Sequence, residues 1–352
     1  MRIAVDGRHL AAGRGVARYT RALLEALVAQ FPREDWRVFV PGRAPVDVSF
    51  PLRRHRLPSR PLFGAAALAA RPRLDRLVDG ADVVWAPAPA PLAVSAGVPL
   101  VLTVHDLAWV RRPEDFTRYE RLWHTVGRLP AQAARAARVL AVSEATRAEA
   151  LAAWGLAPER VVVVPSGPGL GPGAVAATPT RPSYFLAVGA LEPRKEPLLL
   201  ARAHALARER GLTSELVFAG EGRLARDLTG PGVRVLGRVG DVTLRGLYAS
   251  ALAVVHPAVL EGFGFPPVEG LALGTPAIVA DLPVYDETVG GGALRIPPGD
   301  EQAFADAMLA VERDADLRAR LAAAGAEAVA DLSWERAARE TFAQLRLAAE
   351  FA

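Results

Sequence analysis

Short apolar runs alternate with helix-length amphipathic segments along almost the whole chain, and this alternation limits the possible folds more than any other feature. It stops once, over residues 165–182 (PSGPGLGPGAVAATPTRP), where five prolines and four glycines fall within 18 residues. Because proline lacks a backbone N–H and glycine is costly to order, such a segment does not form a core helix or strand. The interruption therefore predicts a linker between two domains.

The apolar runs are apolar on both faces, which is typical of parallel strands covered by helices. A length of 352 residues corresponds to about two domains. We therefore predict an α/β fold of two doubly wound, Rossmann-like domains that face a cleft. The expected boundaries are 1–165 for an N-terminal domain, 166–182 for the linker, 183–332 for a C-terminal domain and 333–352 for a final helix that packs back on the N-terminal domain.

Helical spacing predicts three helices in the first half, and the chain is expected to be mainly helical from Asp300 onward. These helices are Val16–Phe31, Phe116–Arg135 and Glu144–Trp154. The predicted strands are Arg2–Asp6, Trp36–Val40, Val83–Ala86, Leu100–Val104, Val139–Val142, Val161–Val164, Tyr184–Val188, Glu215–Ala219, Val233–Leu236, Ala253–His256 and Pro276–Ala280.

The composition excludes several classes of function. The absence of cysteine excludes a disulfide scaffold, a thiolate zinc site, an iron–sulfur cluster and a cysteine nucleophile. The net charge is only +4, and no aromatic-interleaved basic stripe is present, so we expect no nucleic-acid partner. No apolar run reaches about 18 residues, and the first residues lack the apolar region of a signal peptide, so a cytoplasmic protein is expected.

The chain contains a single lysine, Lys195, while the other 41 basic residues are arginine. Lys195 follows Arg194 at the expected start of a helix, directly after a predicted strand. Two cations oppose the helix dipole there, and a bound dianion would offset that cost. The pair is therefore either a diphosphate-binding site or a solvated helix start.

Two carboxylates, Glu261 and Glu269, flank a glycine-rich loop in the segment EGFGFPPVE. The prolines suit the first helical positions, and Glu269 would then lie in the first turn of that helix. Carboxylates repel phosphate, so the arrangement makes sense if each glutamate binds neutral hydroxyls while phosphate contacts backbone N–H groups. A nucleoside-diphosphate sugar satisfies all these requirements.

Two features of the first half are more ambiguous. The glycine loop of residues 7–15 lacks the third glycine of the dinucleotide fingerprint, because Arg18 stands in its place, so NAD binding is disfavoured. His105 ends a predicted strand, where it is either a cleft residue or a core histidine. His9, in the glycine loop, is a weaker candidate.

The chain resembles the retaining glycosyltransferases of family 4, which have the GT-B architecture. The Glu-x7-Glu element from Glu261 to Glu269 is the signature of that family, and LGTPAIVAD, VGALEPRKEPLLL, LVFAGEG and VRVLGRVGD follow its usual order. In the first half, GRHLAAGRGVARYTRALL, VHDLAW, AVSEATR and VVVVPSG agree with the same family. The similarity covers nearly the whole sequence.

The resemblance implies a role for each candidate residue. Arg194 and Lys195 would hold the donor diphosphate, and Glu269 would bind the ribose. Glu261, with the loop formed by Gly262, Phe263 and Gly264, would contact the donor sugar. His105 would contact that sugar from the N-terminal domain, and Gly15 would approach the diphosphate. Pro165-Ser166 and Leu273 depart from the usual pattern of the family without removing any of these groups.

The expected reaction transfers a hexosyl group, preferably mannosyl, from a GDP-, UDP- or dTDP-linked sugar with retention. No cofactor and no metal are expected, since cations neutralise the leaving group, and Asp314-x-Asp316 is interpreted as a solvated helix face. Two other functions stay open: a nucleotide-sugar epimerase and a non-catalytic nucleotide-sugar-binding module.

The acceptor is not readable from the sequence. Residues 53–56 (RRHR) and Arg60 adjoin an apolar segment, residues 62–70. This cluster is either a peripheral contact with an anionic membrane or a solvated loop beside a core helix.

Overall fold

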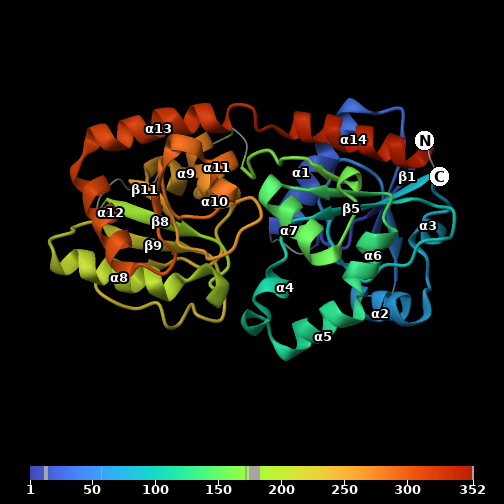
Figure 1. Cartoon of the computed structure of the whole chain (residues 1–352), viewed down its shortest axis with the longest axis horizontal. Coiled ribbons are helices and arrows are strands. Elements are labelled where there is room, and N and C mark those ends of the chain that lie inside the picture. Colours follow the sequence, from blue (N-terminus) through green and yellow to red (C-terminus); the bar gives the residue numbers. More distant parts are fainter. Residues whose placement is uncertain (12–14, 57, 171–172, 174–182, 351–352) are drawn as a thin grey trace. The chain divides into compact units, whose positions relative to one another are not determined.

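The computed structural model describes every residue except 12–14, 57, 171–172, 174–182 and 351–352. The chain forms two compact units (Figure 1). Unit 1 contains residues 1–167 and 332–352, and unit 2 contains residues 168–331. Most of the expected linker, residues 166–182, lies outside the described residues.

Unit 1 is built on a sheet of seven parallel strands in the order β3-β2-β1-β4-β5-β6-β7. Runs of apolar residues such as RIAVD and LVLTV form its central strands, which are buried on both faces. The order reverses direction between β1 and β4, so the loops after these two strands diverge. The strands are β1 (Arg2–Asp6), β2 (Asp35–Pro41), β3 (Leu52–His55), β4 (Val83–Ala86), β5 (Leu100–Val104), β6 (Arg138–Ala141) and β7 (Val161–Val163).

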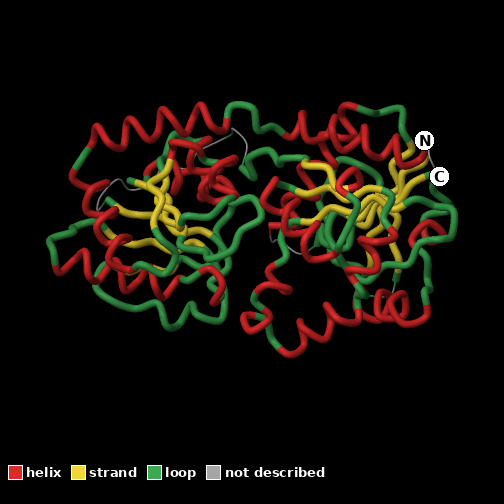
Figure 2. The backbone as a smooth tube through the Cα atoms, in the orientation of Figure 1, coloured by secondary structure: helices red, strands yellow, loops and turns green. Residues whose placement is uncertain are grey.

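Unit 2 repeats this plan with six parallel strands in the order β10-β9-β8-β11-β12-β13. Here the order reverses between β8 and β11. In both units helices cover the strands (Figure 2), so the expected doubly wound α/β class is confirmed. The strands are β8 (Tyr184–Val188), β9 (Glu215–Ala219), β10 (Val233–Val235), β11 (Ala253–His256), β12 (Ala277–Ala280) and β13 (Ala293–Ile296).

The helices bury one apolar stripe each against a sheet, as α1 does with Leu23, Leu24 and Leu27. Unit 1 has α1 (Gly15–Gln30), α2 (Ser59–Ala69), α3 (Leu74–Leu77), α4 (Ala108–Arg111), α5 (Arg118–Val126), α6 (Leu129–Arg135) and α7 (Glu144–Trp154). Unit 2 has α8 (Pro197–Glu209), α9 (Asp241–Ser250), α10 (Phe265–Ala272), α11 (Val284–Thr288), α12 (Glu301–Arg313) and α13 (Ala315–Val329).

The last helix, α14 (Trp334–Glu350), belongs to unit 1 and lies along α1 (Figure 1). Phe342 stacks on Phe31 with ring centroids 3.8 Å apart, and Trp334 contacts Tyr19 edge-on. Gly167 allows the backbone to lie close to the start of α14, since a Cβ at this position would come within 2.6 Å of the Trp334 backbone nitrogen. The apolar face of α14 is thus part of the core of unit 1.

Outside the candidate site, the structure differs from three expectations about strands and helices. Strands β3 and β13 were not expected, because LRRH is an exposed edge strand rich in charge and ALRI is short. The helix expected over Phe116–Arg135 is two helices, because Arg128 adopts a left-handed conformation (φ 48°) directly before α6.

Candidate active site

The carboxyl ends of β8 and β11 define the place in unit 2 where chemistry is expected. The strand order reverses between these neighbours, and ligands of open parallel sheets bind in the crevice at such a switch point. The loop after β8 carries Arg194 and Lys195, and the loop after β11 carries Glu261. Residues that are 66 positions apart in the sequence therefore lie at one edge of the sheet.

Glycines of the segment LVFAGEG bring the first of these loops into place. A Cβ at Gly220 would lie 1.8 Å from the carbonyl oxygen of Gly189, and one at Gly222 would lie 2.3 Å from that of Leu191. Any side chain at either position would push the loop after β8 outward. Glycine is thus needed after β9 so that the segment leading to Lys195 can pack against it.

Arg194 and Lys195 lie in a single 3-10 turn, Pro193–Lys195, rather than in a helix proper. Helix α8 begins two residues later than expected, at Pro197, after Glu196 in a left-handed conformation. The side chain of Lys195 turns toward β11 and forms an ion pair with Glu261. These two side chains are only 17% and 11% exposed, so their charges are largely removed from water.

His256, the last residue of β11, contacts the same carboxylate. Its Nε2 nitrogen lies 2.6 Å from Oε1 of Glu261. Burial would raise the pKa of Glu261, but the ammonium of Lys195 and the hydrogen bond from His256 hold that pKa well below its ordinary value. Burial lowers the pKa of His256. Glu261 raises this pKa, while the positive charges of Lys195 and Arg194 lower it further. The cluster at neutral pH is therefore an ammonium, a carboxylate and a neutral imidazole that donates its Nε2 proton.

The loop of Gly262, Phe263 and Gly264 leads from Glu261 into α10. Gly264 has φ +81°, and a Cβ there would come within 2.6 Å of the Tyr285 ring, so glycine is required both by conformation and by space. Phe263 is buried and packs against Phe265, with ring centroids 5.1 Å apart. Pro266 and Pro267 occupy the first turn of α10, as expected.

Glu269 is 2% exposed and lies in the second turn of α10, not in the first turn as expected. Its Oε2 accepts a hydrogen bond of 2.7 Å from the Tyr248 hydroxyl of α9. Tyr248 is itself fully buried. A cavity of about 20 Å³ opens nearby between the loops after β8 and β11, and Lys195 and His256 line it.

The remaining candidates, His105 and Gly15, belong to unit 1. His105 follows β5, and its Nε2 lies 2.8 Å from the carbonyl oxygen of Pro87. That nitrogen therefore carries the proton, which leaves Nδ1 as an acceptor. Burial lowers the pKa of His105, which keeps the ring neutral. Gly15 begins α1, and a Cβ there would meet nothing within 4 Å. Both interpretations of His105 stay open.

Unit 1 holds a buried pair of its own at its switch point. Asp6 ends β1 and forms an ion pair of 2.6 Å with Arg8, and the two side chains are 1% and 5% exposed. The Arg8 guanidinium lies 3.2 Å from the centroid of the Phe63 ring. His9 follows in the same loop, and burial lowers its pKa to about 4.

The sequence did not identify His256, Tyr248 or Tyr285 as site residues. A signal existed for His256, which stands at the carboxyl end of a predicted strand, where His105 was noticed for the same reason. Tyr248 and Tyr285 lie on helices with ordinary apolar spacing, and only the fold brings them to Glu269 and Gly264.

Two further features concern metal and membrane. The described part of the chain holds no group of three or more His, Cys, Asp or Glu side chains arranged to bind a metal ion. Asp314 caps α13 by accepting a hydrogen bond from the Leu317 nitrogen, and both Asp314 and Asp316 are exposed. Among the described residues, no helix has the length and apolar character needed to cross a bilayer.

Comparison with known proteins identifies two family models that together span most of the chain. Residues 13–168 match Glycosyltransferase Family 4, and residues 174–328 match Glycosyl transferases group 1. The O-antigen chain mannosyltransferase RfbU of Salmonella typhimurium is 33% identical over 150 residues, which are 39% of this chain and 41% of that protein. The matched region thus spans less than half of that relative.

Two other similarities extend further. The D-inositol 3-phosphate glycosyltransferase of Kribbella flavida is 32% identical over 285 residues, 72% of this chain and 66% of that protein. The crystal structure of Anabaena Alr3699/HepE in complex with UDP and glucose superposes with a TM-score of 0.69 at 19% identity, over 98% of this chain and 99% of that one. The two family models, these relatives and the two parallel-sheet units agree, and the chain belongs to the family 4 glycosyltransferases.

Proposed function

We propose that this glycosyltransferase moves a hexosyl group, preferably mannosyl, from a nucleoside-diphosphate sugar to a hydroxyl acceptor, with retention of configuration. The observation that carries the proposal is the cluster of Lys195, Glu261 and His256 at the switch point of unit 2, beside the first turn of α10. Mannosyltransferases among the relatives support the sugar, and the UDP bound by the Anabaena protein supports a nucleotide-linked donor.

Lys195 and Arg194 supply the positive charge that the leaving diphosphate requires. Stabilising a charge that develops in the transition state is the largest single contribution in many enzymes. In this proposal the two cations neutralise the leaving diphosphate, so no metal ion is needed. Backbone N–H groups of the loop from Gly262 to Gly264 add dipoles at the same edge of the sheet.

The two glutamates bind neutral hydroxyl groups in this proposal. Glu261 accepts from the hexosyl group, and Glu269, fixed by Tyr248, accepts from the ribose. His105 and Gly15 of unit 1 retain the roles that the family pattern implies, as contacts to the sugar and to the diphosphate.

We propose same-face substitution as the route to retention. The bond between the anomeric carbon and the diphosphate oxygen breaks, and the acceptor oxygen bonds to that carbon on the same face. The acceptor proton passes to the leaving phosphate oxygen, so no protein nucleophile is needed.

The acceptor is a hydroxyl on a saccharide, a lipid-linked glycan or a small molecule. Peripheral contact with an anionic membrane would present a lipid-linked acceptor, and the surface of α2 and α5 supports this part of the proposal. Tyr119 and Leu122 of α5 are 51% and 62% exposed, and Leu68 of α2 is 83% exposed. Arg60 lies over the Tyr119 ring. Sedimentation with anionic liposomes at low salt, reversed at high salt, tests this contact.

Two measurements test the proposed function. A thermal-shift panel of GDP-mannose, UDP-glucose and dTDP-rhamnose identifies the donor, because a ligand at about 100 times its dissociation constant stabilises the protein by about 2.7 kcal/mol. Incubation of the preferred donor without acceptor then separates the alternatives. Slow hydrolysis supports a transferase, an isomerised sugar nucleotide indicates an epimerase, and an unchanged donor indicates a binding module.

A further inference from the structure

Lys195 has one partner in the structure and a different partner in the proposed function. In the proposed function Lys195 binds the donor diphosphate, yet in the structure it forms an ion pair with Glu261. A diphosphate that draws Lys195 away leaves the Glu261 carboxylate buried without its cation. An uncompensated buried charge is strongly destabilising, so another group must take over the carboxylate when the donor binds.

We propose that His256 is the positioning residue that holds Glu261 when Lys195 moves to the diphosphate, and that it takes up a proton as it does so. His256 already contacts the carboxylate oxygen that Lys195 contacts, at 2.6 Å. Its ring is buried at the end of β11, where it cannot turn to solvent. This inference rests on the proposed function and adds the proton that accompanies donor binding.

The charges around His256 give the direction of the proton transfer. Burial, Lys195 and Arg194 favour the neutral ring of His256, and Glu261 favours the charged ring. A bound diphosphate neutralises both cations and removes one of them from Glu261. The balance then shifts toward imidazolium, so the protein gains a proton near neutral pH.

Among the residues that the structure describes, the elements packed around β11 contribute no other group of comparable effect on the pKa of His256. The neighbouring strands β8 and β12, with sequences YFLAV and AIVA, carry no acidic or basic side chain. Glu269 of α10 is hydrogen-bonded to Tyr248. Tyr285 of α11 is close to Glu261, but burial and that carboxylate raise its pKa well above the ordinary value, so it does not titrate near neutrality.

Protonated His256 would keep Glu261 in a fixed orientation and ionised. The carboxylate then accepts hydrogen bonds from hydroxyls of the hexosyl group. Without His256, the freed carboxylate would lose the donor that fixes its orientation toward the sugar.

Isothermal titration calorimetry measures this proton directly. GDP-mannose, UDP-glucose and dTDP-rhamnose serve as probes, because their diphosphodiesters have no titratable group near pH 7. Each titration is run at pH 7 in PIPES, HEPES and Tris, whose ionisation enthalpies differ. We expect the best-bound sugar nucleotide to bind with uptake of up to about one proton in the parent protein.

The variant His256→Gln is expected to bind the same probe with no proton uptake and with a raised KM and lowered kcat. The matched control is His204→Gln. His204 is the other histidine of unit 2, is equally buried and is hydrogen-bonded to the Ser214 carbonyl oxygen, away from the site. Proton uptake in this control should equal that of the parent.

The outcomes separate the two proposals. Binding without proton uptake in the parent, or equal uptake in His256→Gln, would overturn the role of His256 and leave the proposed function intact. Failure of every sugar nucleotide to bind would overturn both. Should His256→Gln not fold, NMR of Cε1-labelled histidine in the parent, assigned with His204→Gln, decides instead: the His256 signal must move to the imidazolium position when the donor is added.

Discussion

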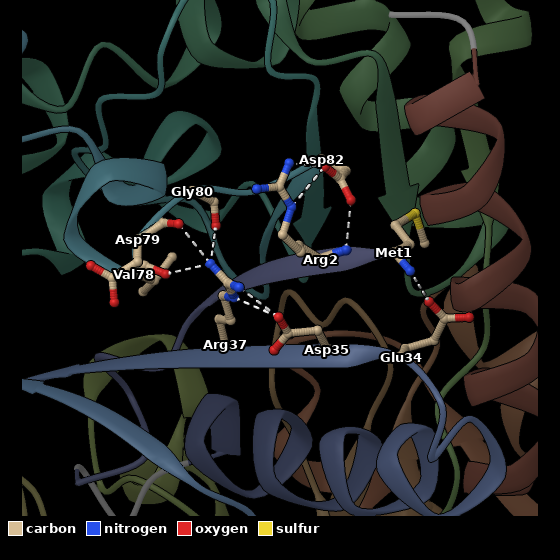
Figure 3. Close-up of polar contacts among 9 residues, drawn as sticks. All are labelled: Met1, Arg2, Glu34, Asp35, Arg37, Val78, Asp79, Gly80 and Asp82. Atoms are coloured by element: carbon tan, nitrogen blue, oxygen red, sulfur yellow. Dashed lines mark hydrogen bonds and ion pairs between the residues drawn. The ribbon is translucent and has the colours of Figure 1, made fainter.

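The ion pairs at the amino edge of the unit 1 sheet and the pair at the carboxyl edge of the unit 2 sheet differ in exposure. At the amino edge of the unit 1 sheet, Arg2 pairs with Asp82 and Arg37 pairs with Asp35 (Figure 3). The Arg2 and Asp82 side chains are 50% and 37% exposed. At the carboxyl edge of the unit 2 sheet, Lys195 pairs with Glu261, and these side chains are only 17% and 11% exposed.

This difference indicates what each pair contributes. Arg37 also donates to the carbonyl oxygens of Val78, Asp79 and Gly80, so its contacts are complete within unit 1 and tie the loop before β4 to β2 (Figure 3). The pair of Arg2 and Asp82 is exposed on both sides, and pairs of this kind cost little and contribute little. The pair of Lys195 and Glu261 is expensive to bury. Replacing such a pair by apolar residues is often neutral for stability, which supports the proposed role in binding.

The largest effect is expected from Lys195→Ala. Removing a charge that stabilises the leaving group typically lowers turnover by about 10²–10³ fold. Arg210→Ala is the matched control, because Arg210 forms an exposed pair with Asp306 elsewhere in unit 2 and should leave turnover unchanged. Steady-state assays with the preferred donor measure both. A Lys195→Ala variant within about threefold of the parent would remove Lys195 from the mechanism.

The next effect concerns the entry to α10. Gly264→Ala should destabilise unit 2 by roughly 2–4 kcal/mol, because the new Cβ requires a left-handed backbone and overlaps the Tyr285 ring. Gly274→Ala has nearly the same φ but meets nothing within 4 Å, so about 1 kcal/mol is expected. Urea unfolding of the two variants compares them; equal losses would contradict the packing of Tyr285 on Gly264.

Acid sensitivity should distinguish the buried carboxylate from the exposed ones. The pKa of Glu261 is lowered in the folded state, so its stabilising contribution is present above its unfolded pKa of 4.5 and is lost as pH falls. One such group gives a slope of up to about 1.4 kcal/mol per pH unit. Glu261→Gln should flatten the stability profile between about pH 5 and 3. An unchanged slope in thermal unfolding would exclude the buried pair.

A smaller effect is expected from Tyr248→Phe. This change removes the donor to Glu269 and leaves a buried carboxylate without that hydrogen bond, at a cost of about 1–3 kcal/mol. If Glu269 binds the ribose, KM for the donor should rise more than kcat falls. Tyr184→Phe is the control, since Tyr184 donates to the Leu247 carbonyl oxygen and should affect stability alone. If the KM of Tyr248→Phe for the donor equals that of the parent, Tyr248 has no role in donor binding.

The smallest effect is expected at the amino edge of unit 1. Asp82→Ala breaks the pair with Arg2 and should cost about 0–1 kcal/mol, with no change in turnover. Chemical unfolding and the transfer assay measure the two quantities. A loss of stability as large as that of Gly264→Ala would mean that exposure does not distinguish the pair of Arg2 and Asp82 from the pair of Lys195 and Glu261.

Much of the fold could be predicted because buried parallel strands have a strong signature. Runs such as RIAVD, LVLTV and ELVFA are apolar on both faces, and their observed bounds equal the predicted ones. Strand β3 could not be predicted in this way, because an edge strand with charged side chains is stabilised by backbone pairing with β2.

The candidate site divides along the same line. Lys195, Glu261 and Glu269 could be identified from the sequence because their residue types and spacing indicate chemistry. Their partners could not, because the contact of His256 with Glu261 and that of Tyr248 with Glu269 depend on tertiary packing. The pairing of Lys195 with Glu261 was likewise unexpected, because Lys195 was assigned from the sequence to the diphosphate of the donor and Glu261 to its sugar.

The most direct test is a crystal structure of the protein with its preferred sugar nucleotide. The account predicts that Nζ of Lys195 contacts the diphosphate and that Glu261 stays hydrogen-bonded to His256. The other carboxylate oxygen of Glu261 then accepts a hydrogen bond from a hydroxyl of the hexosyl group. A ligand bound away from the carboxyl ends of β8 and β11, or an intact pair of Lys195 and Glu261 beside an occupied site, would contradict it.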